Sequence, residues 1–352
     1  MRTFQLLFVV LFLVFYTSIT FATIKSLSGI CTPARKRKIR NLVLIISILV
    51  ILAFVSLYIW PLNTRTTDEY SMHLVFNIIL SIDFIFKIPL AFAFLIGIFF
   101  RKNRKYIIYF MGLLLSLGIS SSVLYGALFG TKELAVNRIE MRFQYLPQGF
   151  NGFSLMQISD VHLGNFLNSK KTLQKVVKAS EKENVDAVFF TGDMVNNFSK
   201  ELEGWNDIFT SITKNRDAFA ILGNHDYGDY TDWKSESDKT KNFNQIIKAQ
   251  QDFGFQLLNN EHAKLKMDSD SIFVIGVENW GHPPFPQYAN LDSAMAGIPE
   301  ESFKILLSHD PAHWDEIVKY RDDIALTLSG HSHGLQWGIK KAGINFSLSY
   351  LT

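Results

Sequence analysis

Apolar residues are distributed unevenly along the chain, in long unbroken runs before residue 130 and in short segments after it. The long runs cover about residues 4–22, 42–60, 73–100 and 106–129. Each run is close to the ~20 residues that a membrane-spanning helix needs. The pattern therefore predicts an α-helical transmembrane bundle of four helices over residues 1–129.

Two basic clusters indicate how these helices would cross the membrane. Arg35 to Arg40 lies between the first and second runs, and Arg101 to Lys105 lies between the third and fourth. Short segments rich in Lys and Arg stay on the cytoplasmic side. We therefore expect the N-terminus and everything after residue 130 to be extracytoplasmic. In the alternative the first run is a cleaved signal peptide, which would return the second half of the chain to the cytoplasm.

The third apolar run contains an unusual pair of charges, Asp83 and Lys87, four residues apart on one helix face. Charged residues inside a membrane span are costly, and they often mark a proton or headgroup site. The other interpretation is a mutually neutralising pair packed inside the bundle. We expect the second.

Residues 130–150 have no clear period and predict a linker, whereas residues 151–352 have the pattern of an α/β domain. Apolar segments at 153–159, 185–192, 218–222, 303–308 and 324–329 predict strands, and residues 169–184 predict an amphipathic helix. Strands that alternate with helices are typical of a sheet that presents side chains at its strand ends.

Polar residues that bind metals follow each of these strands. The positions are Asp160 and His162, then Asp193, then Asn224, His225 and Asp226, then His309, and finally His331 and His333. Buried cores do not favour such residues, so this repeated placement indicates a site. Oxygen and imidazole ligands without thiolate suit manganese, iron or zinc, and seven candidate ligands suit two divalent metal ions that share one carboxylate.

Composition narrows the alternatives. The chain of 352 residues has one cysteine, Cys31, which excludes an internal disulfide and a cysteine-based zinc site. Its net charge is only +3, and much of the basic excess lies in the two clusters beside the helices. We therefore expect no nucleic-acid partner.

The order of motifs resembles the calcineurin-like metallophosphoesterase superfamily, and in particular its bacterial membrane-anchored members. The matching segments are Asp160-Val161-His162, Gly192-Asp193, Gly223-Asn224-His225-Asp226, His309 and Gly330-His331-Ser332-His333. The resemblance implies a four-layer α-β-β-α sandwich over residues 151–352. Relatives usually continue through further strands after the last motif, so we expect either a domain truncated at its C-terminus or a sandwich that closes early.

The resemblance also implies roles for the site residues. One metal would be held by Asp160, His162, Asp193 and His333, and the second by Asp193, Asn224, His309 and His331. His225 would contact the phosphate and protonate or stabilise the leaving group, and Asp226 would orient His225.

The function expected from these roles is hydrolysis of phosphomonoesters or phosphodiesters by metal-activated hydroxide. The expected location is the bacterial plasma membrane, where membrane lipids surround the helices. This location suggests that the substrate is an envelope lipid or a lipid-linked molecule. The alternative is a non-catalytic membrane sensor that uses the same domain to bind a ligand. The aromatic, proline-rich segment 279–287 is a further hypothesis, with Trp280 and Phe285 available to an apolar tail of the substrate.

Overall fold

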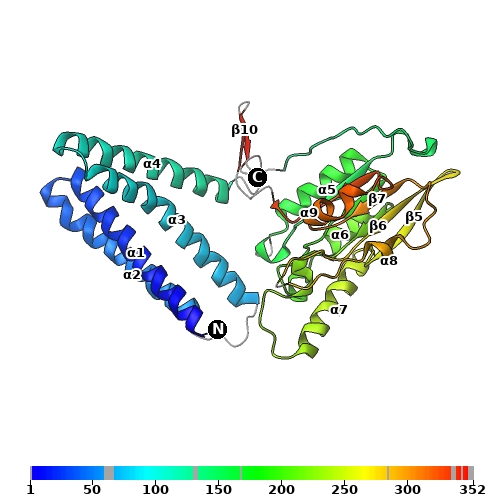
Figure 1. Ribbon diagram of the computed structural model, residues 1–352, viewed down its shortest axis with the longest axis horizontal. Coiled ribbons are helices and arrows are strands. Elements are labelled where there is room, and N and C mark those ends of the chain that lie inside the picture. Colours follow the sequence, from blue (N-terminus) through cyan, green and yellow to red (C-terminus); the bar gives the residue numbers. More distant parts are fainter. Residues whose placement is uncertain are drawn as a thin grey trace. The chain divides into compact units, whose positions relative to one another are not determined.

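The computed structural model describes residues 2–58, 67–129, 134–166, 169–283, 285–333, 338–341 and 344–347. The chain divides into two compact units, Met1–Glu133 and Leu134–Thr352 (Figure 1). The described part of the first unit is helical, and the second contains two four-stranded sheets and one two-stranded sheet.

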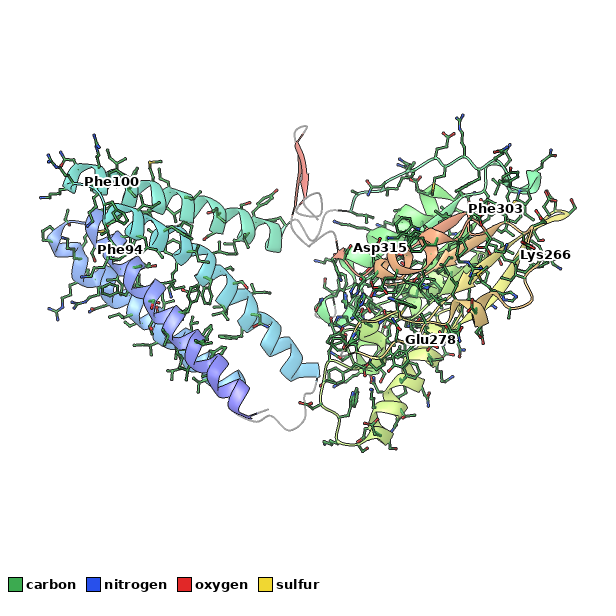
Figure 2. All side chains as sticks on the ribbon, in the orientation of Figure 1. Phe94, Phe100, Lys266, Glu278, Phe303 and Asp315 are labelled. Atoms are coloured by element: carbon green, nitrogen blue, oxygen red, sulfur yellow. The ribbon has the colours of Figure 1, made fainter. Side chains whose placement is uncertain are left out.

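Four long helices form the described part of the first unit. They are α1 (Arg2–Ile30), α2 (Pro33–Tyr58), α3 (Thr67–Gly97) and α4 (Lys102–Leu128). Each contains a stretch of 22 to 25 residues that is long and apolar enough to cross a membrane. Large apolar side chains such as Leu49, Phe92 and Met111 are exposed along these helices. Phe100, which Figure 2 labels, is also exposed and lies between α3 and α4. The predicted four-helix region is confirmed, and it fits a membrane protein.

The second helix begins earlier than the apolar run at 42–60 predicts, because the basic cluster at residues 35–40 forms its first turns. Helix α2 begins at Pro33, and only residues 31 and 32 separate it from α1. Proline suits the first turn of a helix, and Lys and Arg are good helix formers. The predicted end of the second run at residue 60 and most of the connection after it lie outside the described residues.

A polar cluster lies inside the helical unit and joins three of its helices. The Lys87 Nζ atom is 2.7 Å from Asp83 Oδ2, 2.7 Å from the Tyr16 hydroxyl and 2.9 Å from Ser47 Oγ. The Tyr16 hydroxyl also donates to Asp83 Oδ2 at 2.7 Å. Lys87 is only 2 % exposed. All three of its N–H donors thus have acceptors, as the interpretation of a pair packed inside the bundle requires.

Two four-stranded sheets form the centre of the second unit. The first has the order β1-β2-β3-β4 and is parallel, and the second has the order β5-β6-β7-β8 with only the β5–β6 pair antiparallel. The strands are β1 (Leu155–Ile158), β2 (Ala187–Phe190), β3 (Asp217–Ala220), β4 (Gln256–Leu257), β5 (Glu261–Met267), β6 (Asp270–Gly276), β7 (Lys304–Leu307) and β8 (Leu326–Leu328). A separate hairpin pairs β9 (Gly338–Lys341) with β10 (Ile344–Ser347). The five strands predicted from the sequence all form, each shorter than its apolar segment, and β2 and β8 are half as long as predicted.

Alternating side chains on these strands build three apolar cores. Val188 and Phe190 of β2 pack in a core that also contains residues of α5 (Lys171–Glu183), α6 (Asn206–Thr213) and α7 (Glu236–Asp252). Phe189 of β2 faces the core between the sheets, where Phe303, labelled in Figure 2, also packs. Leu306 of β7 faces a third core with α8 (Leu291–Met295). The layers are therefore helix, sheet, sheet and helix, which confirms the predicted α-β-β-α sandwich.

Shorter elements complete this unit. They are α9 (Pro311–Glu316) and five 3₁₀ turns: η2 (Gln148–Phe150), η3 (Leu163–Phe166), η4 (Ser199–Leu202), η5 (Asn224–Tyr227) and η6 (Val318–Tyr320). The described residues 134–147 of the expected linker form neither helix nor strand.

Candidate metal centre

The candidate ligands lie just beyond the carboxyl ends of five strands. Asp160 and His162 follow β1, Asp193 follows β2, Asn224 follows β3, His309 follows β7, and His331 and His333 follow β8. In each sheet these strands run parallel, so their carboxyl ends meet at one edge. The core that both sheets share brings the two edges together. The fold thus gathers residues that are up to 173 positions apart, from Asp160 to His333.

Four of these residues form a first group. Asp160, His162, Asp193 and His333 each offer one ligand atom, and the four atoms all lie within 4.8 Å of one another. The His333 Nε2 atom is 3.2 Å from Asp160 Oδ1 and 3.1 Å from His162 Nε2. This is the set that the resemblance implies for one metal.

A second group shares Asp193 with the first. Asp193, His309 and His331 also offer atoms within 4.8 Å of one another. Asn224 joins them through its Oδ1 atom, which lies 3.1 Å from His309 Nε2 and 2.9 Å from His331 Nδ1. Asp193 is 1 % exposed and His309 is fully buried, so the shared carboxylate sits inside the protein rather than on its surface.

The backbone at the site is unusual. Asp160, His162, Asp193, His331 and His333 all have positive φ, between 47° and 70°. Residues other than glycine seldom adopt this conformation, and where they do the strain is often associated with a functional site. Five of the seven candidate ligands therefore depend on the surrounding fold to hold them in place.

Two glycines allow the ligand loops to approach each other. Gly192 has φ +97°, and a Cβ atom there would lie 2.6 Å from both the Gly223 nitrogen and His309 Nδ1. A Cβ atom at Gly223 would overlap the Asp193 carboxylate. Contacts this short leave no room for a side chain, so glycine is required at both positions.

The donor and acceptor chemistry of the cluster fits a cation. His309 Nδ1 lies 2.7 Å from the Thr191 carbonyl oxygen, and His162 Nδ1 lies 3.2 Å from that of Val195. A carbonyl oxygen only accepts, so each ring carries a hydrogen on Nδ1 and turns its Nε2 toward Asp193 Oδ2, at 3.2 Å and 3.6 Å. A cation bound between these atoms would take the place of any proton on Nε2. Imidazoles anchored through Nδ1 to a carbonyl are the usual arrangement of histidines that bind a metal.

Burial and the charges of neighbouring groups shift the pKa values of the residues in the cluster. Burial lowers the pKa of His309, but the Asp193 carboxylate outweighs burial and raises it to about 9. Burial also opposes ionisation of Asp193, yet His309 holds the pKa of this carboxyl well below its usual range. Burial lowers the pKa of His162 and His331, which keeps these rings neutral as ligands must be.

A model of the calcineurin-like phosphoesterase family matches residues 153–335, which is more than half of the chain. The match spans all the strands whose ends carry the candidate ligands. The chain belongs to the calcineurin-like phosphoesterase family.

Several curated relatives of this phosphoesterase have descriptive names. A transmembrane protein with metallophosphoesterase domain from Danio rerio is 27% identical over 220 residues, which is 60% of this chain and 47% of the relative. An uncharacterized metallophosphoesterase from Aquifex aeolicus is 27% identical over 209 residues, 58% of this chain and 71% of the relative. The UDP-2,3-diacylglucosamine pyrophosphatase LpxG of Chlamydia trachomatis is 26% identical over 234 residues, 54% of this chain and 67% of the relative. The chain thus spans about half the length of the Danio rerio protein.

The Asp226 side chain of this phosphoesterase has other hydrogen-bond partners than the expected His225. Its carboxylate accepts the backbone N–H groups of Asp193 at 2.9 Å, Met194 at 3.0 Å, Val195 at 3.3 Å and Gly223 at 2.9 Å. The Nδ1 atom of His225 is instead 2.8 Å from the Asn196 carbonyl oxygen. The prediction that Asp226 orients His225 is therefore wrong, because the Asp226 side chain faces the ligand loop. Burial and the Asp193 carboxylate raise the pKa of Asp226 to about 7.

Glu201 is a site residue that the sequence analysis did not identify. Its carboxylate accepts the N–H groups of Asn196 at 2.7 Å, Asn197 at 3.0 Å, Phe198 at 2.9 Å and Gly164 at 3.1 Å. Asp226 and Glu201 together thus hold most of the loop 193–198. The available signal was an acid at the third position of a helical turn, but Phe198 stands where a capping Ser or Thr would be expected.

The aromatic residues of segment 279–287 have different partners. The Phe285 ring packs against Tyr230 at 5.0 Å between centroids, and Tyr230 stacks on His225. The Trp280 ring instead stacks on His313, and its Nε1 atom donates to Glu316. Phe285 therefore adjoins the candidate centre through Tyr230, while Trp280 packs against α9.

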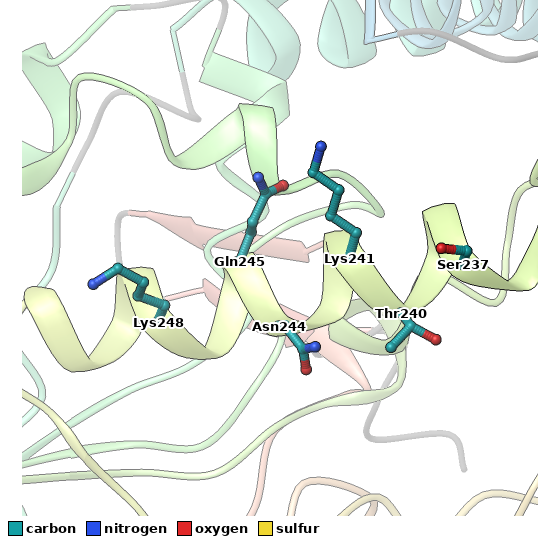
Figure 3. A pocket seen from close by; sticks show the side chains of 6 residues that line it. All are labelled: Ser237, Thr240, Lys241, Asn244, Gln245 and Lys248. Atoms are coloured by element: carbon teal, nitrogen blue, oxygen red, sulfur yellow. The ribbon is translucent and has the colours of Figure 1, made fainter.

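A hollow of about 500 Å³ lies along helix α7, and its lining residues do not belong to the segments that carry the candidate ligands. Figure 3 shows the six side chains that line it, Ser237, Thr240, Lys241, Asn244, Gln245 and Lys248. They all come from one helix, and none is a candidate ligand. We therefore assign the hollow no part in the site.

Proposed function

We propose that the protein is a membrane-anchored dimetal phosphoesterase that hydrolyses phosphomonoesters or phosphodiesters. The observation that carries this proposal is the sharing of the Asp193 carboxylate by two ligand groups. A carboxylate shared in this way suits two divalent cations held close together. Membership of the calcineurin-like phosphoesterase family supports the same reaction class.

The first cation would be held by Asp160, His162, Asp193 and His333, and the second by Asp193, Asn224, His309 and His331. Oxygen and imidazole ligands suit manganese, iron or zinc. When bound, the cations would polarise the phosphate and lower the pKa of a bound water. Asp193 is itself fixed, because its Oδ1 atom accepts the backbone N–H of His225 at 2.9 Å.

His225 is proposed to donate the proton that the leaving group needs. Its Nδ1 hydrogen is committed to the Asn196 carbonyl oxygen, so the proton to be transferred must be carried on Nε2. The ring lies 4.8 Å from that of His162, between centroids, which places it beside the first ligand group. Proton donation matters most for leaving groups that are poor without it.

An envelope lipid or a lipid-linked phosphoester is the proposed substrate class. The four long apolar helices would keep the domain at a membrane. Relatives from Chlamydia trachomatis and Chlamydia muridarum are named UDP-2,3-diacylglucosamine pyrophosphatase, and that name describes cleavage of the pyrophosphate in a nucleotide-linked sugar that carries two acyl groups. A phosphoester carried by a lipid is consistent with both observations.

The proposed location is the bacterial plasma membrane, with the phosphoesterase domain on the extracytoplasmic side. The basic residues at the start of α2 and those around residues 101–105 support this orientation. The test uses a Cys31→Ser background with Tyr320→Cys, because Tyr320 is 77 % exposed. A membrane-impermeant maleimide should label this protein in intact spheroplasts. Labelling only after lysis would place the domain in the cytoplasm.

The reaction itself is tested on the full-length protein in detergent. Hydrolysis of p-nitrophenyl phosphate and bis-p-nitrophenyl phosphate is measured with Mn²⁺ or with chelator, for the wild type, Asp193→Ala and the control Asp292→Ala. The Asp292 side chain is 96 % exposed. Turnover that needs metal and is lost only in Asp193→Ala is expected. Two bound metals without turnover of either ester would instead favour the non-catalytic sensor.

A further inference from the structure

Tyr230 contacts two of the residues on which the proposed chemistry depends. Its hydroxyl accepts a hydrogen bond from Asn224 Nδ2 at 2.7 Å. The other end of the same amide, Oδ1, faces His309 and His331. Tyr230 thus restrains the rotation of the Asn224 side chain, and in doing so it keeps the oxygen in the second ligand group.

The ring of Tyr230 holds the other residue. It stacks on the His225 imidazole with 4.4 Å between centroids and an angle of 18° between planes. A second contact restrains the imidazole, the hydrogen bond from its Nδ1 atom to the Asn196 carbonyl oxygen. A stacked ring and one hydrogen bond together fix both the tilt and the rotation of His225.

The fold fixes Tyr230 in turn. Its backbone N–H donates to Asn197 Oδ1 at 3.2 Å, and Asn197 is fully buried in the loop that carries Asp193. Beside it, Asp229 forms an ion pair with Lys239 of α7 at 2.5 Å. Phe285 packs against the Tyr230 ring. Tyr230 therefore has a position that the ligand loop, α7 and segment 279–287 determine jointly.

We propose that Tyr230 is a positioning residue that couples the second metal site to the proton donor, with its hydroxyl acting on Asn224 and its ring acting on His225. The part that concerns His225 rests on the proposed function. The part that concerns Asn224 rests on geometry alone, and it can be measured without turnover.

Two substitutions separate the two contacts. Tyr230→Phe removes the hydroxyl and keeps the ring, so the affinity for the second metal should fall about 10-fold while the first site is unchanged. The leaving-group dependence should stay as in the wild type. Tyr230→Leu removes both contacts, so the rate with a poor leaving group should fall at least about 10-fold more than the rate with a good one.

The measurements use the full-length protein in detergent. Metal-free protein is titrated with Mn²⁺ by calorimetry, which reports both sites. Hydrolysis of phenyl phosphate and p-nitrophenyl phosphate at saturating Mn²⁺ then gives the leaving-group ratio. Tyr145→Phe is the matched control, because Tyr145 is 83 % exposed and lies outside the site. It should match the wild type in both measurements.

Two results would overturn the proposal. One is a Tyr230→Phe protein whose second Mn²⁺ affinity equals that of the wild type. The other is a folded Tyr230→Leu protein with an unchanged leaving-group ratio. If Tyr230→Leu does not fold, the Mn²⁺ titration of Tyr230→Phe decides. A wild type that binds two Mn²⁺ ions without turnover would refute the proposed function but not the contact with Asn224, whereas one that binds none would refute both.

Discussion

The carboxylate of Asp226 accepts the backbone N–H of Asp193 at 2.9 Å, so a second buried acid holds the residue that both ligand groups share. Asp226 is fully buried, and it also binds the next two N–H groups of the same loop. The loop has a strained residue at Asp193 itself, with φ 59°. The hydrogen bonds of Asp226 offset that strain, and they give the ligand loop a single conformation.

Asp226→Asn should therefore weaken the metal centre from a distance. Each carboxylate oxygen of Asp226 accepts two backbone N–H groups. Asparagine replaces one of these oxygens by an NH₂ group, which cannot accept a hydrogen bond. Two buried donors lose their partner, which costs about 2 to 4 kcal/mol. Chemical denaturation and metal content after purification measure the effect. Asp292→Asn, at an exposed position, is the control, and equal stability of the two variants would contradict the role of Asp226.

Gly192→Ala tests whether the ligand loops need close backbone approach or only a positive φ. Gly192 and Gly297 have φ of +97° and +86°, but a Cβ atom would meet its neighbours at 2.6 Å at Gly192 and nothing within 4 Å at Gly297. Alanine at Gly297 should cost only the backbone term of about 1 to 2 kcal/mol. Alanine at Gly192 should cost more and should also lose bound metal, because the new methyl group displaces His309. Unfolding curves and metal analysis of the two variants make the comparison, and similar losses in both would show that φ alone matters.

The sequence was sufficient to name the candidate ligands that the fold brings together, because each follows a strand, and strand ends are a local signal. Asp160, Asp193 and His309 could be placed in this way without knowing which strands are neighbours. The roles of Asp226 and Tyr230 could not, because they depend on contacts between loops that the sequence does not specify. The same holds for the helix boundary at Pro33, where hydropathy marks the apolar run but not the basic turns that precede it.

His313 should make stability fall in weakly acidic solution. Its Nδ1 atom lies 2.9 Å from Ser308 Oγ, its ring stacks on Trp280, and burial lowers its pKa to about 4. A histidine in an unfolded chain has a pKa of about 6.5. Between that pH and pH 4, the unfolded chain therefore binds a proton at His313 that the folded protein does not bind. The free energy of unfolding should therefore be highest above pH 6.5, and it should fall by up to about 3 kcal/mol toward pH 4.

His313→Gln isolates this contribution because glutamine does not titrate. The variant should be less stable than the wild type at pH 7, and the gap should narrow as the pH falls toward 4. Denaturation of both proteins in chelator from pH 7 to 4.5 measures the gap, since metal release then affects neither. A gap that stays constant with pH would refute the assignment.

Lys87→Met should destabilise the helical unit more than the loss of both charges does. The single substitution leaves the largely shielded Asp83 with the Tyr16 hydroxyl as its remaining hydrogen-bond partner among the described residues, and breaking a buried ion pair costs about 3 kcal/mol or more. Asp83→Leu combined with Lys87→Met removes both charges, so the double variant should recover much of this loss. Thermal unfolding in detergent compares the two with Lys38→Met, a lysine on an exposed part of α2. A double variant less stable than the single one would contradict the interpretation of Asp83 and Lys87 as a mutually neutralising pair.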